Sequence, residues 1–274
     1  MNASQISVVL PIFAPTAFLR AMTEFAIKTL RLHADHDFEL IVVEAEHDYF
    51  DPNRTDAVMY PSDFGRTKNG KNACLLVDKY FNFNPKIGGV KELNAGVRAA
   101  SNEFVLSTGN DVIAPPHWDT ELLRCFEGRA DCGVASLSAF EPGAVIGPPI
   151  TQDRIVEGMY SPFMMFRRGR EFDEAYVKFY QDSDFVMQTY ELGQRAYRSC
   201  RAHVHHLLRM TSDRVEPEQH RKDLAYDERL FYERWGKSPL AMFALIRYGQ
   251  YAYGQEHQSF TNQIALHYDP GAKA

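Results

Sequence analysis

Two apolar runs near the start of the chain are typical of buried β-strands. Residues 6–12 are rich in β-branched side chains with no polar alternation, and residues 38–43 return to strand character after a helical stretch. The helical stretch follows Pro15, and its apolar residues form one stripe: Phe18, Met22, Phe25, Ala26 and Leu30. The pattern predicts a β-α-β unit, whose crossover is expected to be right-handed.

The same alternation continues to residue 126. Residues 75–77 and 103–107 are the next expected strands, separated by a turn at residues 88–89 and a short helix. The buried side of this helix is marked by Val90, Leu93, Val97 and Ala100. The helix expected after the two prolines at 115–116 is marked by Trp118, Leu122 and Phe126.

The second half of the chain mixes strands and helices. We expect strand and loop at residues 132–150, a helix at 183–192, strands at 196–208 and a helix at 222–235. Together these patterns predict an α/β fold with a doubly wound, mostly parallel central sheet flanked by helices, a mixed α/β second half and a C-terminal helical appendage. In such a sheet, ligands bind at the carboxyl ends of the strands.

Length and composition narrow the class of protein. The 274 residues are 45% apolar and 24% charged, as in an ordinary globular protein. The formal net charge of -6 disfavours a surface built mainly for nucleic acid. No apolar run approaches the roughly 20 residues that span a bilayer, and the first residues lack a signal-peptide pattern. We therefore expect a cytoplasmic protein without a transmembrane segment.

One carboxylate stands at the carboxyl end of the strand at residues 103–107. The chain leads from this strand through Gly109 and Asn110 to Asp111. Mg²⁺ and Mn²⁺ prefer carboxylate oxygens, so Asp111 is a candidate ligand for a cation that bridges a nucleotide diphosphate. The alternative is an ordinary turn, in which Asn and Asp form local hydrogen bonds.

Two further acids precede the apolar positions of the helix at residues 183–192. Asp182 has the position of a helix N-cap, and Asp184 complements the helix dipole. A carboxylate on a helix that points into the crevice is also suited to act as a general base toward an acceptor hydroxyl. The two roles are compatible with each other.

Three histidines lie in the strand-like stretch at residues 202–207. Alternation places His203 and His205 on one face and His206 on the other, so they cannot share one ion without a bulge. We expect a single metal ligand among them, the alternative being histidines that bind no metal. Glu44, after the second strand, is placed to accept hydrogen bonds from a nucleotide.

Taken together and in order, segments between residues 5 and 236 resemble glycosyltransferase family 2, whose members have the GT-A fold and use nucleotide-sugar donors. Residues 7–11 and 39–44 resemble the family's first two strands, and residues 88–100 its glycine turn and Asn-containing helix. The most specific segment, residues 103–118, resembles the family's Asp-x-Asp strand and the helix after it, through residues 109–112 and 115–118. The later segments at 157–158, 166–168, 172–174 and 181–184 follow the order of its acceptor half.

The resemblance implies a role for each candidate residue. Asp182 would be the catalytic base, and Asp111 with His206 would hold Mn²⁺ or Mg²⁺, with His205 as the alternative histidine. The residues implied in nucleotide-sugar binding are Pro11, Phe13, Glu44, Asn94, Asn110 and Asp111. The residues implied in acceptor binding are Glu157, Gly158 and Asp184.

The chain departs from the family pattern at two places. Gly109 stands where the family has the first acid of its triplet, and Gln181 stands where it has the Glu of a Glu-Asp pair. These departures keep open the alternative of a sugar-nucleotide-binding protein without turnover. A transferase acting on a hydroxylated nucleic-acid base is a further alternative, which the negative net charge disfavours.

The resulting hypothesis is an inverting, metal-dependent hexosyl- or pentosyltransferase. It would move a sugar from a UDP-, dTDP- or GDP-linked donor to an acceptor hydroxyl, expected to be that of a carbohydrate. We assign residues 1–215 to the transferase domain, with the nucleotide-sugar half at 1–115 and the acceptor half at 116–215. Residues 216–274 form the appendage.

Overall fold

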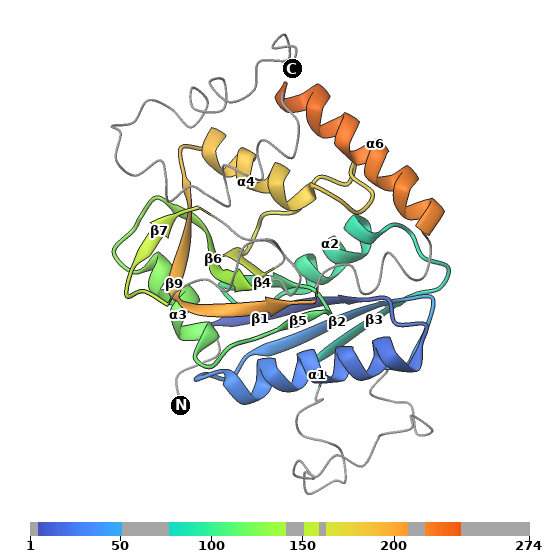
Figure 1. Cartoon of the computed structure of the whole chain (residues 1–274), viewed down its shortest axis with the longest axis horizontal. Helices are drawn as coiled ribbons and strands as arrows, with labels where there is room; N and C mark the ends of the chain where they lie inside the picture. Colours follow the sequence, from blue (N-terminus) through green and yellow to red (C-terminus); the bar gives the residue numbers. More distant parts are fainter. Residues whose placement is uncertain (1–4, 51–76, 141–150, 159–162, 208–216, 237–274) are drawn as a thin grey trace, which may run out of the picture.

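The computed structural model describes residues 5–50, 77–140, 151–158, 163–207 and 217–236 (Figure 1). The strands are β1 (Ile6–Ile12), β2 (Glu39–Ala45), β3 (Lys79–Phe83), β4 (Phe104–Thr108), β5 (Val112–Ile113), β6 (Cys132–Phe140), β7 (Ile155–Glu157), β8 (Phe163–Arg167) and β9 (Arg195–His206). The helices are α1 (Ala17–His33), α2 (Gly89–Ala99), α3 (Trp118–Phe126), α4 (Gln181–Glu191) and α6 (Pro217–Trp235).

The strands form one sheet in the order β3-β2-β1-β4-β8-β6-β9-β5, with β7 paired to β9. Strands β1 to β4 pair in parallel, and β6 and β9 run in the same direction as these four. Strands β5, β7 and β8 run in the opposite direction. The strand order reverses at β1, which lies between β2 and β4. The predicted α/β fold with a doubly wound, mostly parallel sheet is confirmed.

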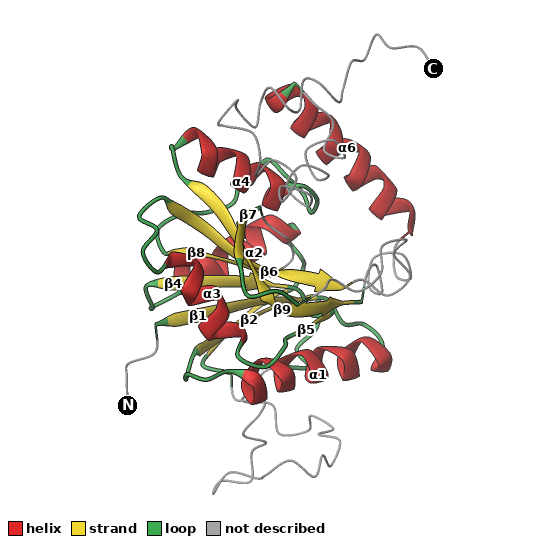
Figure 2. Ribbon diagram, turned by 60° about the vertical axis from the view of Figure 1, so that its left-hand side comes forward, coloured by secondary structure: helices red, strands yellow, loops and turns green. Residues whose placement is uncertain are grey.

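Helices cover both faces of the sheet and enclose two separate apolar cores. Helices α1 and α3 pack on one face, around Val8, Leu10 and Val42. Helices α2, α4 and α6 belong to the other face, where they pack around Val9 and Val43. Figures 1 and 2 show the same layers, with α1 below the sheet and α2, α4 and α6 above it. Each buried side chain of this size stabilises the fold by roughly 1.5–3 kcal/mol relative to exposure.

A glycine lets α2 lie close to the sheet. A Cβ atom at Gly96 would meet the Cγ1 of Val9 at 2.5 Å and the Cγ2 of Val43 at 2.8 Å. Any larger residue would therefore push α2 away from β1 and β2. This close packing fixes the distance between α2 and the sheet. The first turn of α2 lies near the carboxyl edge of the sheet, because α2 follows β3 after a short loop.

One expected strand and the expected buried face of one helix differ from the structure. The third strand lies at Lys79–Phe83 instead of 75–77, because Val77 is not in a strand and residues 75–76 lie outside the described residues. In α1, the expected apolar stripe is also misplaced, because Phe18 and Phe25 are each 51% exposed. The helix instead buries Leu19, Met22, Ala26, Ile27 and Leu30.

The strand that carries the three histidines changes register along its length. Leu137 of β6 lies opposite Ser199 of β9, whereas the next residue, Ser138, lies opposite His203. Residues 200–202 therefore form a bulge. Beyond the bulge, the end of β9 also pairs with β5.

The C-terminal helix α6 lies over the same face as α4 (Figures 1 and 2). It begins at Pro217, five residues before the expected start at 222, and ends at Trp235 as expected. The rest of the predicted appendage, residues 237–274, lies outside the described residues. None of the helices in the described part of the chain combines the length and apolarity that crossing a bilayer requires.

Candidate active site

Three candidate residues follow strands whose carboxyl ends meet at one edge of the sheet. Phe13 comes directly after β1, Glu44 lies at the end of β2, and Asp111 follows β4. In open α/β sheets, ligands bind at this edge, next to the strand at which the order reverses. Here that strand is β1, and Pro11 lies within it, paired with Val43 of β2.

The two predicted metal ligands, far apart in the sequence, are neighbours in the fold. Strand β5 pairs with the end of β9 and places Val112 opposite His206, while the N–H of Leu207 donates to the carbonyl of Asp111 at 2.9 Å. The Nε2 of His206 lies 3.5 Å from the Oδ2 of Asp111. Both side chains are partly exposed, by 14% and 15% respectively.

This pair suits a divalent cation whose other ligands come from outside the chain. Within the described ranges, no group of three or more His, Cys, Asp or Glu side chains is arranged to hold an ion. Mg²⁺ is commonly bound by one or two carboxylates, with waters and substrate phosphates completing its coordination. A cation held by Asp111 and His206 would likewise need oxygen ligands from a phosphate group and water.

The other two histidines of β9 face different neighbours. The ring of His205 packs edge-on against Phe140 at 5.4 Å between centroids. The Nε2 of His203 lies 3.0 Å from the Oγ1 of Thr151, and burial lowers the pKa of this imidazole. Of the three histidines, His206 is the one that lies within 3.5 Å of Asp111, and its role as a metal ligand stays a prediction.

Asn110 is directed into the protein next to Asp111. Its side chain is buried, and Nδ2 donates to the Oγ1 of Thr23 in α1 at 3.0 Å. The Thr23 hydroxyl in turn donates to the carbonyl of Leu19 at 2.9 Å. This arrangement ties the segment that carries Asp111 to α1. It gives Asn110 a positioning contact through Nδ2, and its direct contact with a nucleotide stays a prediction.

The Glu44 carboxylate is also used by the chain itself. It is fully buried, accepts the backbone N–H groups of Tyr49 and Phe50 at 3.0 Å each, and accepts the hydroxyl of Tyr80 at 2.8 Å. Burial raises the pKa of Glu44, although these three donors act in the opposite direction. Glu44 therefore holds the loop after β2 in place, and its expected direct contact with a nucleobase is not supported by this geometry.

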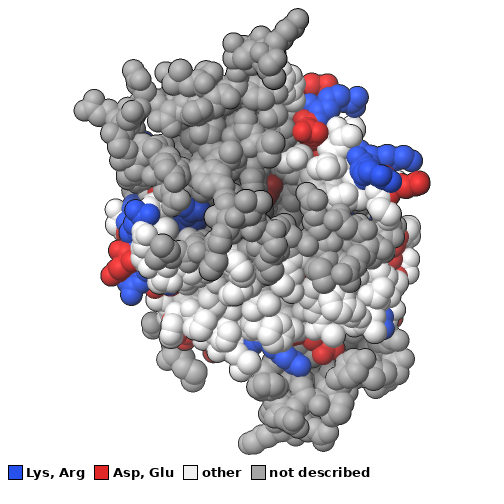
Figure 3. All heavy atoms as spheres, viewed as in Figure 1, with Lys and Arg blue, Asp and Glu red and all other residues white. Residues whose placement is uncertain are grey.

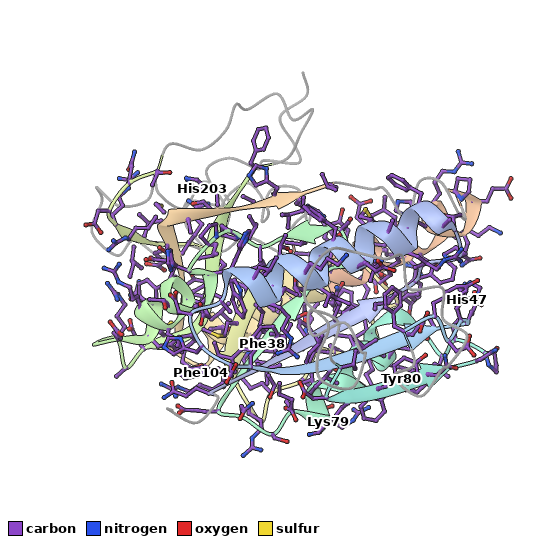
Figure 4. The ribbon with its side chains drawn as sticks, turned by 90° about the horizontal axis from the view of Figure 1, so that it is seen from below. Phe38, His47, Lys79, Tyr80, Phe104 and His203 are labelled. Carbon is purple, nitrogen blue, oxygen red and sulfur yellow. The ribbon has the colours of Figure 1, made fainter. Side chains whose placement is uncertain are left out.

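The loop held by Glu44 borders a hollow of about 310 Å³ at the carboxyl ends of β2 and β3. Its lining residues are Glu46, His47, Asp48, Tyr49, Asn82 and Asn84. The ring of His47 lies parallel to that of Phe13, with 6.2 Å between centroids and 20° between planes. The ammonium of Lys86 lies 5.2 Å from the centre of the Phe13 ring. Figure 4 shows His47 and Tyr80 toward one end of the sheet.

Asp182 lies in the first turn of α4 with a partly exposed side chain. Its Oδ1 accepts the N–H of Ser183 at 2.8 Å. The capping role considered for Asp182 is wrong, because the residue preceding the helix is Tyr180, in a left-handed conformation with φ 59°. The N–H of Val90, in the first turn of α2, donates to the carbonyl of Val177 at 3.3 Å, which places the approach to α4 near the carboxyl edge.

Asp184 is fully buried, which corrects its expected role as an acceptor contact. Its carboxylate accepts the indole N–H of Trp235 at 2.8 Å and the amide of Gln188 at 2.6 Å. The guanidinium of Arg234 lies 3.3 Å away, and the hydroxyl of Tyr176 donates at 3.2 Å. Burial raises the pKa of Asp184 despite these partners. The residue is a junction between α4 and α6.

Asn94 has a similar internal role. It is fully buried in α2, and its amide both donates to the carbonyl of Phe172 at 2.8 Å and accepts the N–H of Phe172 at 2.9 Å. It thereby ties α2 to a segment of the predicted acceptor half. This corrects the expected direct contact of Asn94 with a nucleotide sugar, because both polar atoms of its side chain are already bonded to Phe172.

Glu157 and Gly158 lie away from the carboxyl edge. Glu157 ends β7 opposite Tyr197 of β9 and forms an ion pair with Arg195 at 2.7 Å, whereas Gly158 donates its N–H to a β9 carbonyl. Along β6, the partners of Tyr197 and His205 are five residues apart. This spacing corresponds to roughly 17 Å at the usual rise of a strand. The structure therefore does not bring these two expected acceptor residues together with Asp111 and His206.

Comparisons with known proteins identify the fold. No family model and no curated protein sequence matches the chain. Among solved structures, the chain is similar to S. aureus TarS 1–349, with a TM-score of 0.56 and 16% identity over 97% of this chain and 75% of that one. The complex of TarS 1–349 with UDP-GlcNAc gives a TM-score of 0.56, 17% identity, and 97% and 76% coverage.

A second solved structure, that of a mannosyltransferase, is similar to this chain. A mannosyltransferase from Pyrobaculum calidifontis, in complex with GDP-Man and Mn²⁺, has a TM-score of 0.54 and 14% identity over 90% of this chain and 68% of that one. TarS is a glycosyltransferase of the GT-A type. This chain has the GT-A fold. Membership in family 2 stays a prediction, because identities this low establish the GT-A fold alone.

Sequence reasoning missed three residues of this GT-A fold. His47, Asn82 and Lys86 lie at or beside the hollow, and none of them is a candidate residue in the sequence analysis. Their signal was positional, because His47 and Lys86 follow β2 and β3, and Asn82 lies near the carboxyl end of β3. Finding Asn82 required the correct third strand, which the sequence pattern placed too early.

Proposed function

We propose that this chain is an inverting glycosyltransferase that moves a sugar from a UDP-, dTDP- or GDP-linked donor to a hydroxyl of a carbohydrate acceptor. The single observation that supports it most is the contact between Asp111 and His206 at the carboxyl edge of a GT-A fold. The structural neighbours carry UDP-GlcNAc in one case and GDP-Man with Mn²⁺ in the other, which supports a nucleotide-sugar donor.

The nucleoside part of the donor fits the hollow beside β2 and β3. The parallel rings of Phe13 and His47 offer stacking surfaces for a planar base, and stacking of a base on an aromatic side chain is worth about 1–3 kcal/mol. Asn82 and Asn84, in the hollow wall, have the amide groups that recognise base or ribose polar atoms. Lys86 adds a positive charge beside Phe13.

The diphosphate is placed at the end of β4, next to Asp111 and His206. These two residues would hold Mn²⁺ or Mg²⁺, which supplies Lewis-acid stabilisation of charge on the departing diphosphate. Their separation and partial exposure fit a cation that completes its ligands with phosphate oxygens. Asn110 supports this site by anchoring the segment before Asp111 to α1.

Asp182 is the proposed general base. Both Asp111 and Asp182 are partly exposed, so neither is turned into the interior. The carboxylate of Asp182 would accept the proton of the acceptor hydroxyl as that oxygen attacks the anomeric carbon from the face opposite the diphosphate. The diphosphate would leave with its electron pair, which inverts the anomeric configuration. General-base assistance of this kind contributes about 10²- to 10⁴-fold in rate.

The proposal is tested by measuring thermal stability with UDP, dTDP, GDP and their sugars, each with and without Mn²⁺. A ligand that binds only the folded state stabilises it by about 2.7 kcal/mol at one hundred times its dissociation constant. We expect Asp111→Asn and His206→Ala to remove the part of this stabilisation that depends on Mn²⁺. His205→Ala is the matched control, since its exposed ring contacts Phe140 and not Asp111.

Product formation then separates the proposed enzyme from its alternatives. Sugar transfer to carbohydrate acceptors, lost in Asp182→Asn with nucleotide binding retained, supports the proposal. Nucleotide binding without transfer to any acceptor would instead support a sugar-nucleotide-binding protein, and transfer only to hydroxylated nucleic-acid bases would change the acceptor class. Stabilisation by none of the nucleotides, with or without Mn²⁺, contradicts the proposal. Product NMR showing a retained anomeric configuration contradicts the inverting mechanism.

A further inference from the structure

Within the described part of the chain, helix α6 contacts the rest of the protein through one side. Among its described residues, Asp227 and Phe231 are buried, each with 0% exposure. The outer side carries charged residues such as Arg229 and Glu233, whose side chains are 68% and 64% exposed. Figure 3 shows acidic and basic side chains gathered where α6 lies in Figure 1. The inner side of α6 is therefore specialised for contact with the segment around α4.

The first contact joins Asp227 of α6 to the segment just before α4. Its two carboxylate oxygens accept three consecutive backbone N–H groups, those of Val177 and Lys178 at 2.8 Å and of Phe179 at 2.7 Å. A carboxylate that accepts several backbone N–H groups forms strong, charge-assisted hydrogen bonds. The backbone of residues 177–179 is thereby fixed to α6.

The next residue, Tyr180, is held in a conformation that is uncommon for a side chain of its size. Its φ is 59°, and its ring lies 6.0 Å from that of Phe231 in α6. Such left-handed conformations cost about 1–3 kcal/mol and persist where surrounding contacts over-determine them. The contacts made by Asp227 and Phe231 supply that constraint at the entrance to α4.

The second contact lies on the other side of Asp182. The buried carboxylate of Asp184 accepts the indole N–H of Trp235 at 2.8 Å and lies 3.3 Å from the guanidinium of Arg234. Arg234 also contacts the carboxylate of Asp173. Asp182 is therefore bracketed by two attachments to α6, one at residues 177–180 and one at Asp184.

We propose that α6 is the positioning element of the catalytic base, with Asp227, Arg234 and Trp235 fixing the first turn of α4 and with it the direction of the Asp182 carboxylate. This inference rests on the proposed function of Asp182. A displacement of about 1 Å in a reacting group is enough to cost on the order of 10²-fold in rate. The residues of α6 act through Asp182 and need no contact with either substrate.

Trp235→Phe is the principal test, because it keeps an aromatic ring and removes the N–H that Asp184 accepts. We expect kcat for transfer to fall about 10- to 100-fold, with the donor affinity and the acceptor KM within about twofold of the wild type. Tyr232→Phe is the matched control, because it removes one polar atom from an aromatic residue on the exposed side of the same helix. Arg234→Gln, with Arg229→Gln as its control, repeats the test if Trp235→Phe does not fold.

A double-mutant cycle distinguishes positioning from a general loss of structure. In an Asp182→Asn background, Trp235→Phe should lower the residual transfer rate by less than about twofold, because its effect passes through the carboxylate that is already absent. Equal effects in both backgrounds would overturn the inference, and so would a wild-type kcat in both Trp235→Phe and Arg234→Gln.

Hydrogen exchange gives a readout that does not depend on activity. We expect faster exchange of the amides at residues 177–185 in Trp235→Phe and unchanged exchange in α2. If Asp182→Asn retains full transfer, the proposed function of Asp182 fails. If Asp182→Asn lowers transfer to a small residual rate while the α6 variants neither lower kcat nor change exchange at residues 177–185, only the positioning role fails.

Discussion

The loop after β2 and the segment before α4 are both held by buried carboxylates, but these carboxylates lie at very different distances along the chain from the residues they hold. Glu44 fixes Tyr49 and Phe50, which follow it by five and six residues. The segment before α4 is fixed by Asp227, which lies 48 to 50 residues further along the chain. The first region is organised by its own loop, whereas the second depends on a separate helix.

This difference has a functional meaning under the proposed mechanism. The loop held by Glu44 borders the hollow proposed for the nucleoside, so its disturbance should weaken donor binding. The turn held by α6 carries Asp182, so its disturbance should lower turnover with donor binding retained. Substitutions in the two regions should thus separate donor affinity from catalytic rate.

The largest loss of stability is expected for the carboxylate of Asp227, which is remote in sequence from the segment it holds. Asp227→Ala leaves three backbone N–H groups without their acceptor, and we expect a loss of about 3–5 kcal/mol in the free energy of unfolding. Chemical denaturation of this variant and of Glu228→Ala, an exposed neighbour on α6, measures the difference. Equal stability of the two variants would show that α6 is not fastened through Asp227.

A smaller loss is expected in the nucleotide half. Glu44→Ala removes the acceptor of two backbone N–H groups and of the Tyr80 hydroxyl, at an expected cost of about 2–3 kcal/mol. It should also reduce the stabilisation by the best nucleotide in a thermal-shift titration. Tyr80→Phe removes one of the three donors and should show about a third of the stability loss. Unchanged nucleotide binding in Glu44→Ala would show that this loop does not contribute to the donor site.

The smallest effect concerns the ionisation of Glu44. Because burial raises its pKa in the folded state above the ordinary value of 4.5, folding favours the protonated form. Its contribution to stability is therefore greatest below pH 4.5 and is lost as the pH rises through the folded-state pKa. As the pH rises above 4.5, the amount by which the Tm of the wild type exceeds that of Glu44→Gln should decline. Each kcal/mol lost from the free energy of unfolding corresponds to about 2–4 °C in Tm. A difference that grows with pH would contradict this direction.

The strands and helices predicted from continuous apolar patterns are largely confirmed. β1, β2 and β4 are buried on both faces, so their sequences lack polar alternation and were recognisable. The position of β3 was predicted wrongly because none of its residues is fully buried, so polar side chains interrupt its apolar pattern. In α1, the sequence shows two aromatic residues in register with the core, but whether Phe18 and Phe25 face the sheet depends on the rotation of the helix.

The candidate site was predictable where it depended on strand ends. Asp111 follows β4 and His206 ends β9, and pairing with β5 brings them together as expected. The roles of Glu44, Asn94 and Asp184 were not predictable in the same way. The polar atoms of such residues can bind either a ligand or the chain itself, and which of the two occurs depends on partners such as Trp235 that are remote in sequence.

The bulge at residues 200–202 separates the two ends of β9 into independent registers. Before it, β9 is aligned with β6 and β7, and after it the alignment with β5 determines which histidine stands beside Asp111. Because the extra residues of the bulge are not paired with β6, the register before the bulge does not by itself set the register after it. We therefore expect a substitution near Glu157 to leave the pairing of Val112 with His206 unchanged.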